Sequence, residues 1–328
     1  MPLYAMNTVI LNERPFTLVP DEWKIAASLS HNHLHTLSGQ AVITVDGDNA
    51  RTFLQGQLSA DIRLVNAERA QPAALCSLKG RILALMTVLE WEGRLHLVLP
   101  ADNAETVLNT LSRVAALSRV KLLSATDISV FGCVVNTGIE PALPLSSTAS
   151  PYSVAAQDGI IACALGAGDF LVLARGESAH QLCEPFTASN TLLGSLSWHY
   201  RQLLQGRFTI YPQSTDVFLP HRLGLHKGPH LAFDKGCYRG QEVIARMHYK
   251  STVQHHLQRF VCTPPAPLLA GQRLLDKESA KEWGEVVDTC PDGASDSVLV
   301  VASMREGFPH ELRAENHAEP FTLSATSV

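Results

Sequence analysis

The chain has 328 residues, a formal net charge of −5 and 46% hydrophobic residues. This length is too great for one ordinary hydrophobic core, so two or three domains are expected. The composition is typical of a soluble globular protein, and the net charge gives no general attraction to nucleic acid or to a membrane surface. We therefore expect no direct DNA binding and no membrane association.

The N-terminal sequence MPLYAMNTVILNERPFTLVPDEWK lacks the basic stretch and apolar core of a signal peptide, and no apolar run approaches ~18 residues. These features predict a cytoplasmic protein, which we expect to be a monomer. The chain has seven cysteines and no C-x-x-C spacing, which argues against a disulfide framework and a zinc finger. Most of them are expected to be small buried apolar residues, and no metal site is expected.

The first half of the chain alternates between strand and helix signals after a loose arm over about the first 35 residues. A strand is expected at 41–49, and a short helix followed by a loop at 50–62, with Phe53 and Leu54 buried. A meander follows at 72–100, with turns at Lys79-Gly80 and Gly93. The 3.6-residue periodicity predicts a helix at 102–117, with Asp102 as its cap. Its buried face would hold Val107, Leu108, Leu111, Val114 and Leu117.

The second half continues this mixture and then becomes all-β. A hairpin is expected at 159–174, and helices at 178–190 and 194–205. A long irregular segment follows, and loops of that length within a compact protein are usually functional. A strand at 251–262 precedes short strands with turn signals, which suggest a small β-barrel. The fold class is therefore α+β with a C-terminal all-β domain.

Three familiar site patterns can be set aside. GAGDFL at 166–171 lacks the third glycine and the following helix of a dinucleotide-binding loop. HNHLH at 31–35 would place His31, His33 and His35 on one face of a strand, but we expect surface histidines rather than a metal site. No nucleophile elbow and no H-E-x-x-H motif is present.

The segment DKGCYRGQEVIAR, residues 234–246, is a stronger candidate for a functional site than these patterns. Gly236 and Gly240 flank Cys237, and the residues from Gln241 onward read as a helix. Unsatisfied N–H groups at a helix start favour a thiolate. Residue chemistry alone leaves two readings open: a reactive or ligand-contacting Cys237, or a structural turn whose cysteine packs inward.

The charge around this segment is locally positive. Between residues 234 and 259 the chain carries five basic and two acidic residues, which are Lys235, Arg239, Arg246, Lys250, Arg259, Asp234 and Glu242. Aromatic residues are few here, namely Tyr238, Tyr249 and Phe260. The local sequence therefore gives only weak support for direct binding of tRNA.

KGCYRGQE at 235–242 resembles the K-G-C-Y-x-G-Q-E signature of the YgfZ family, which is related to the glycine-cleavage T-protein. FLQGQLSADI at 53–62 is similar to the family's F-L-Q-G-Q-x-T-x-D block, and SLKGRILA at 77–84 is similar to its K-G-R/K turn. WHYRQLLQGRFTI at 198–210 lies where the family has a helix carrying a tryptophan. The resemblance covers about residues 40 to 320.

This resemblance implies interleaved ferredoxin-like sub-domains around a central opening, plus the C-terminal barrel. The expected division is an arm at 1–39, a folate-binding α+β region of two interleaved sub-domains at 40–250, and the barrel at 251–328. It also implies a functional thiol at Cys237 and a tetrahydrofolate or derivative as cofactor. The implied cofactor-binding residues are Asp61, Trp198, Lys235, Tyr238, Arg239 and Gln241.

Two departures from the relatives concern the folate. Leu204 stands where the relatives often have a pterin-contacting glutamate, and Gln40 stands near an aromatic position of the family. In addition, no carboxylate follows the turn at 79–81, although T-proteins use one in one-carbon transfer. Independent catalytic activity of that kind is therefore not expected.

The resemblance implies a folate-binding accessory protein that supports assembly or repair of iron–sulfur enzymes, including those that modify tRNA. Its expected partners are iron–sulfur client or assembly proteins. Two alternatives remain: a folate-dependent one-carbon transferase, and a non-catalytic docking scaffold.

Overall fold

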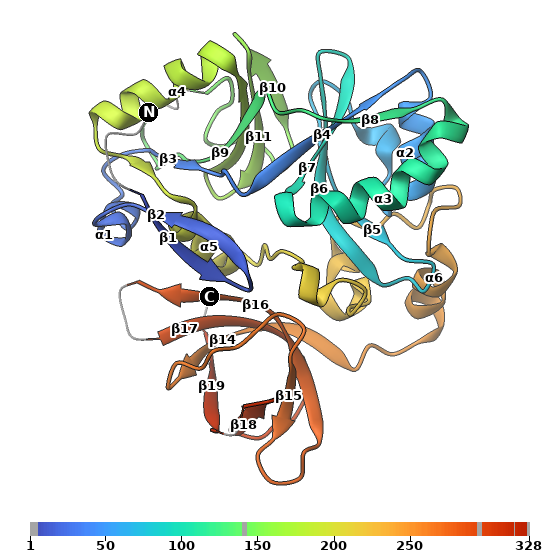
Figure 1. Cartoon of the computed structure of the whole chain (residues 1–328), viewed down its shortest axis with the longest axis vertical. Helices are drawn as coiled ribbons and strands as arrows, with labels where there is room; N and C mark the ends of the chain where they lie inside the picture. The colour runs from blue at the N-terminus through green and yellow to red at the C-terminus, as the bar shows by residue number, and fades with distance from the viewer. Residues whose placement is uncertain (1–5, 140–142, 294–296, 318, 327–328) are drawn as a thin grey trace.

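The computed structural model describes residues 6–139, 143–293, 297–317 and 319–326. Two sheets form the upper part of the molecule and a closed barrel the lower part (Figure 1). A two-stranded hairpin and helix α5 lie between them. The α+β class and the C-terminal barrel expected from the sequence are confirmed.

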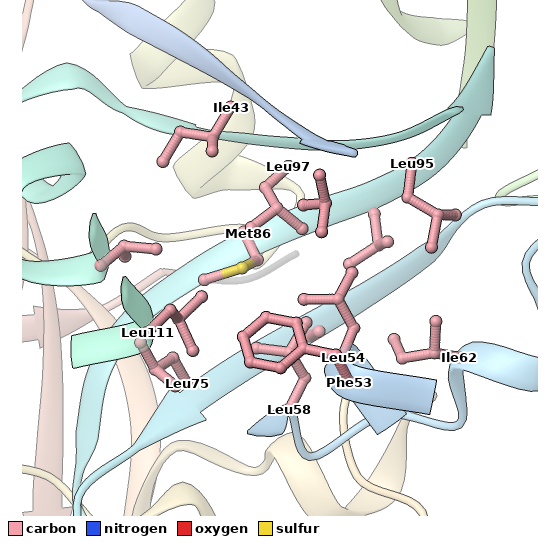
Figure 2. Close-up of a cluster of buried hydrophobic side chains, with 14 of the residues drawn as sticks. Ile43, Phe53, Leu54, Leu58, Ile62, Leu75, Met86, Leu95, Leu97 and Leu111 are labelled. Atoms are coloured by element: carbon pink, nitrogen blue, oxygen red, sulfur yellow. The ribbon is translucent and has the colours of Figure 1, made fainter. Parts of the chain in front are cut away.

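The five-stranded sheet is antiparallel and has the order β5-β6-β7-β4-β8. Its elements are β4 (Gln40–Asp46), α2 (Ala50–Gln57), β5 (Gln71–Cys76), β6 (Ile82–Trp91), β7 (Arg94–Pro100), α3 (Ala104–Ala115) and β8 (Lys121–Ser124). Phe53 and Leu54 of α2 pack with Leu111 of α3 against strand residues such as Leu97 in a fully apolar core (Figure 2). The amphipathic patterns that predicted these elements are thus the faces that this core buries.

Helix α3 differs from its prediction at both ends. Asp102 does not cap it, because both carboxylate oxygens accept hydrogen bonds of 2.8 Å from the guanidinium of Arg14. Leu117 lies beyond the last turn and is 85% exposed, since the helix ends at Ala115. Val107 and Leu111 are buried as expected.

The six-stranded sheet has the order β10-β11-β12-β9-β3-β13, with a single parallel pair between β13 and β3. Its elements are β3 (His33–Thr36), β9 (Ile128–Val134), β10 (Val154–Gln157), β11 (Ile160–Gly166), β12 (Asp169–Arg175), α4 (Gly176–Ala188), β13 (Leu192–Leu193) and α5 (Ser195–Leu204). The whole five-stranded sheet is inserted in the chain between β3 and β9. The two sub-domains are therefore interleaved, as expected.

The first part of the chain is not a loose arm. Residues 7–36 form a hairpin of β1 (Asn7–Leu11) and β2 (Arg14–Leu18), the short helix α1 (Glu22–Ala26) and β3. Phe16 is buried in a core that also contains Leu196 of α5 and Val287 of the barrel. Alternating apolar residues in the hairpin supply this packing, and its partners are far away in the sequence.

The barrel closes in the order β14-β17-β16-β15-β18-β19. Its strands are β14 (His255–Thr263), β15 (Arg273–Asp276), β16 (Glu282–Asp292), β17 (Ser297–Arg305), β18 (Glu311–Ala314) and β19 (Phe321–Ala325). An irregular segment with three short 3₁₀ turns leads from α5 to helix α6 (Gln241–Lys250). The start predicted for this helix at Gln241 is confirmed. The predicted domain boundaries remain predictions.

Candidate functional site

A cavity of about 250 Å³ lies where the two sheets meet helix α5. Strands β6 and β7 form one side, β11 and β12 contribute to another, and α5 with residues 206–209 completes the wall. Most of the lining is apolar. Polar side chains at the wall include Gln40, Thr87, Ser195, Gln202, Thr209 and His230.

Trp198 of α5 lines this cavity and is 7% exposed. One face of its indole lies against Gly132 of β9, where an added Cβ would come within 2.5 Å of the ring. The imidazole of His35 lies 5.5 Å from the ring, centroid to centroid. The strand backbone covers one face of the indole, so a ligand in the cavity could contact only the other face or the edge of the ring.

Helix α5 is held in place by a buried carboxylate from α1. Glu22 is 1% exposed, and one of its oxygens accepts hydrogen bonds from the backbone N–H of Val19 (2.8 Å) and of Gly194 (2.9 Å). The other oxygen accepts from the backbone N–H (3.1 Å) and the hydroxyl (2.6 Å) of Ser197. Two of these donors, Gly194 and Ser197, lie at the start of α5, where N–H groups lack partners within the helix and favour negative charge. The segment expected to be a loose arm thus fixes the helix that carries Trp198.

Two histidines of β3 are buried near the same helix. His33 and His35 are 1% and 2% exposed, so the expectation of surface histidines is wrong for both, whereas His31 is exposed. Burial lowers the pKa of His33 to about 4 and that of His35 to about 3. His35 Nδ1 lies 3.0 Å from the carbonyl of Gly194, which opposes this shift. Both rings are therefore neutral at pH 7 and are packed inside the protein.

The two arginines at the cavity wall are bound to internal carboxylates. Arg14 pairs with Asp102 and donates to the carbonyl of Ile210 at 3.0 Å. Arg207 pairs with Asp169, which is fully buried. Their charges are thus offset inside the protein, and the cavity has no free cation from these residues to hold an anionic group.

Gln40 and His230 differ from these arginines, because their side chains find no hydrogen-bond partner within the described ranges. Burial lowers the pKa of His230 to about 4, so its imidazole is neutral and can donate from one nitrogen and accept at the other. Gly206 also lines the cavity, but Leu204 does not and is 40% exposed. Of the two positions that differ from the YgfZ pattern, Gln40 therefore lines the cavity and Leu204 does not.

Cys237 lies outside this cavity, in an exposed loop directly before α6. Gly240 ends the loop with a φ of +79°, and a Cβ there would come within 2.4 Å of the Ser77 carbonyl. Only glycine fits such a close approach in this conformation. The turn at 77–80 and the helix start therefore lock together, and the thiol stays accessible.

Lys235 anchors the loop from beneath. Its ammonium donates to the carbonyl oxygens of Leu58 (2.8 Å) and Ala60 (2.6 Å) and lies 5.0 Å from the centre of the Tyr238 ring. Burial lowers its pKa to about 8, against an opposing effect of Asp61. Lys235 is thus engaged with the end of α2 rather than with the Cys237 thiol.

The other predicted ligand residues of the loop also make internal contacts. Arg239 donates through Nε to the carbonyl of Cys76 at 3.1 Å. The Gln241 side-chain oxygen accepts from the backbone N–H of Tyr238 at 3.3 Å. Burial raises the pKa of the Tyr238 phenol, whose hydroxyl is buried and has no partner among the described residues.

Asp61 lies beside this loop. A hydrogen bond from Arg63 lowers the pKa of the carboxyl group to about 2, and Gln55 donates to it at 3.0 Å. The structure therefore divides the predicted residues into two groups. Trp198 lines the cavity, whereas Asp61, Lys235, Tyr238, Arg239 and Gln241 surround the Cys237 loop.

The sequence did not identify His230 as a site residue. It lies within the long irregular segment. The sequence shows that a histidine is there, but it does not show which part of the fold that histidine contacts. His230 lines the cavity, and Lys235 and Cys237 follow it within a few residues, so this stretch of chain connects the cavity to the Cys237 loop. The backbone N–H of Ala232 also donates to the Ser59 carbonyl at 2.9 Å, which ties this stretch to the end of α2.

One further group has metal-like composition. Ligand atoms of His255, Glu282 and Glu285 lie within 4.8 Å of one another on the barrel. Arg222 pairs with Glu285, and Arg305 donates to His255 at 3.2 Å. Arginines thus occupy the positions that a cation would need, so this group is better explained as an ion-pair network.

Comparisons with known proteins agree with the motifs. A tRNA-modifying protein YgfZ from Vibrio atlanticus (strain LGP32) is 24% identical over 244 residues, covering 74% of this chain and 73% of the relative. The protein of the same name from Yersinia pseudotuberculosis serotype IB (strain PB1/+) is 27% identical over 240 residues, covering 72% of each chain. No family model matches the chain.

The crystal structure of glycine cleavage system aminomethyltransferase T from Bartonella henselae has the same fold, with a TM-score of 0.74. The match covers 98% of this chain and 93% of that one, at 15% sequence identity. Across the described ranges, no helix is long and apolar enough to cross a membrane. The chain is thus a sequence relative of the YgfZ proteins with the fold of the glycine cleavage T-protein, as its motifs indicated.

Proposed function

We propose that this protein is a YgfZ-type accessory protein, which holds the pterin of a reduced folate in the cavity and presents the Cys237 thiol to iron–sulfur enzymes, including those that modify tRNA. The observation that carries the proposal is the composition of the cavity wall. Trp198, Gln40 and Gly206 come from segments that the family resemblance associates with folate, and all three line one cavity. The names of the relatives support the link to tRNA modification.

The residues of the cavity fit a flat, polar heterocycle. Its walls are mostly apolar, the indole of Trp198 can pack against a ring, and Gln40 and His230 can hydrogen-bond to its edges. The volume of about 250 Å³ lies below the roughly 300–1,000 Å³ of pockets that enclose drug-sized ligands. We therefore expect the pterin to be enclosed and the glutamate end of the folate to extend beyond the cavity.

Tetrahydrofolate, when bound, supplies a carrier for one-carbon units, but the chain has no obvious group for that transfer. The turn at 79–81 is followed by Ile82, Leu83, Ala84 and Leu85. Arg81 instead donates to the carbonyl of Val217. A supporting role is therefore favoured over aminomethyl transfer.

Cys237 is the exposed thiol of the chain. Five of the other six cysteines are buried, and Cys183 is partly buried. Iron–sulfur clusters need about four protein ligands. Cys237 would therefore act by transient thiol chemistry or as one ligand to a cluster that a client protein also holds.

A titration of tetrahydrofolate, followed by calorimetry, tests the cavity. We expect saturable binding to the wild type, binding at least tenfold weaker in Trp198→Ala, and weaker binding in Gln40→Ala, a smaller change at the wall. Trp283→Ala in the barrel is the matched control and should bind normally. The absence of saturable binding to the folded wild type would remove folate from the proposal.

The thiol is tested by complementation of a strain that lacks the protein, with the activity of an iron–sulfur enzyme as readout. Cys237→Ser should fail to restore that activity, and Cys183→Ser should restore it fully. If Cys237→Ser restores full activity at equal protein level, the thiol has no such role, and a docking scaffold becomes the better explanation.

A further inference from the structure

The Cys237 loop and helix α6, which follows it directly, contact two other segments that also carry cations. The turn after β5 packs on α6, because a Cβ on Gly80 would lie 3.0 Å from the Val243 side chain. The His221 ring lies 4.8 Å from that of His226 and 5.9 Å from that of His248, which joins the 3₁₀ turns to the same helix. Four exposed cations and the half-buried Arg239 lie on these contacting segments, and we call them the basic face: Lys79, Lys227, Arg239, Arg246 and Lys250.

These five cations have no carboxylate partner within the residues that the structure describes. Only two exposed acidic residues, Asp234 and Glu242, lie in the same segments. Asp61 lies beside the loop, but its charge is paired with that of Arg63. The chain as a whole carries a net charge of −5, so this concentration of free positive charge is a local feature. Such a face attracts a polyanion without first breaking internal ion pairs.

Helix α6, which carries Arg246 and Lys250, also carries an aromatic platform. The rings of Phe233 and His248 stack at 3.7 Å with an angle of 18° between their planes. The ring of Tyr249 stands edge-on to His248 at 4.8 Å, and Tyr249 is 68% exposed. An exposed aromatic ring fixed by neighbours can stack on an unpaired base at little cost in conformational entropy.

We infer that the basic face around Cys237 binds RNA through its phosphates, with an unstacked base placed on Tyr249. Free cations alone would also suit an acidic protein, but an exposed aromatic platform among them favours a polymer that offers both phosphates and flat rings. Duplex DNA offers no splayed base and is expected to bind more weakly. The inference extends the proposed function by naming the partner that meets the thiol, and it rests on that function only for the thiol's relevance.

Fluorescence anisotropy with an unmodified tRNA transcript tests this inference. The triple variant Lys79→Glu, Arg246→Glu and Lys250→Glu should bind at least tenfold more weakly at about 0.1 M salt. The slope of log affinity against log salt should fall in magnitude by about 2, because each lost phosphate contact removes roughly 0.7. Tyr249→Ala should weaken binding roughly tenfold, and Tyr249→Phe should keep it.

A matched control carries the same change of net charge elsewhere. Lys24→Glu, Arg113→Glu and Lys121→Glu replace exposed cations of α1, α3 and β8 and should bind the transcript like the wild type. Equal loss in this control would overturn the inference, because it would mean that only total charge matters. A polyglutamate peptide that displaces the RNA, together with an unaffected Tyr249→Ala, would assign the face to an acidic protein instead.

The two proposals can fail separately. The basic face and the cavity share no residue, so the triple variant should bind tetrahydrofolate normally. Absence of RNA binding to a wild type that still binds folate would overturn the inference and leave the proposed function standing.

Discussion

At the scale of single residues, the histidines of β3 show how burial sets charge. His33 and His35 are neutral because desolvation depresses the pKa of each ring below that of the unfolded chain. His33 Nε2 is buried without a partner among the described residues. Protonation of either ring in acid would therefore create a positive charge inside the folded protein, where water cannot stabilise it.

This burial predicts a loss of stability in mild acid. The folded pKa values of about 4 and 3 lie below the usual histidine value of 6.5, so the contribution is complete above pH 6.5 and is lost as the pH falls toward 4. Each ring should cost about 2 kcal/mol at pH 5. Urea unfolding at pH 7 and pH 5 measures the difference.

Variants separate these two rings from other groups that titrate in the same range. His33→Gln and His35→Gln should each flatten the pH dependence. His31→Gln, at an exposed position, should change it only slightly, because His31 is the smallest of the three causes that lower the pKa of His33. An unchanged slope in both buried variants would contradict the assignment.

The residue scale also shows which site features the sequence could reveal. KGCYRGQE indicated a glycine-flanked loop ahead of a helix, and the structure has that loop. Its contacts with Leu58, Cys76 and Ser77 join residues far apart in the sequence, so the motif could not show them. The local charge count around it was misleading: Lys235 is buried, and Arg259 donates to the carbonyl of Leu204. Lys79, far away in the sequence, and Lys227, which lies before the range counted, supply part of the basic face instead.

At the scale of elements, the contact between β9 and α5 shapes the cavity. Gly132 lets the indole of Trp198 lie directly on the strand. The side chain at this strand position therefore decides how far the helix stands from the sheet and how much space remains in the cavity.

We predict that Gly132→Ala displaces the indole and destabilises the protein by about 1–3 kcal/mol, the usual cost of overpacking. It should also weaken tetrahydrofolate binding. Urea unfolding and the folate titration measure the two effects.

Gly56→Ala in α2 is the matched control, because a Cβ there meets nothing within 4 Å. It should stabilise the protein by up to about 1 kcal/mol, since alanine is the better helix former. If Gly132→Ala proved as well tolerated, the close contact would have no structural importance.

Elements whose pattern is local were predictable, and those whose partners are distant were not. The strand at Gln40–Asp46 and helix α3 follow from periodicity within their own residues. The hairpin at 7–18 packs on α5 and the barrel, so nothing near it in the sequence indicated that it would be ordered. Asp102 has the position of a cap, but Arg14 binds it from that hairpin.

At the scale of the whole molecule, a buried carboxylate joins the barrel to the rest. Asp288 of β16 is fully buried, lies 3.0 Å from His199 Nε2, and accepts from the Tyr211 hydroxyl at 2.8 Å. Its second oxygen accepts from the backbone N–H of Thr209 at 3.1 Å. The partners belong to α5 and the segment that follows it, so this group links the barrel to the cavity wall.

Removing this carboxylate should loosen the attachment. Asp288→Ala is expected to lower the free energy of unfolding by about 3–5 kcal/mol, because it leaves buried donors without an acceptor. Chemical unfolding, followed by the signal of the barrel tryptophan Trp283, measures the loss. Glu278→Ala, at an exposed position of the barrel, should change it by less than about 0.5 kcal/mol. A similarly small change in Asp288→Ala would show that the apolar contacts alone hold the barrel.

The parallel pairing of β3 with β13 limits the order in which strand pairs can form during translation. Leu34 pairs with Leu192, so the edge of β3 stays without this neighbour until the chain beyond β13 has left the ribosome. At typical elongation rates of about 5–20 residues per second, that interval is roughly 10–30 s. The five-stranded sheet, made entirely in between, can fold first, and β3 can pair with β9 on its other edge before β13 is made.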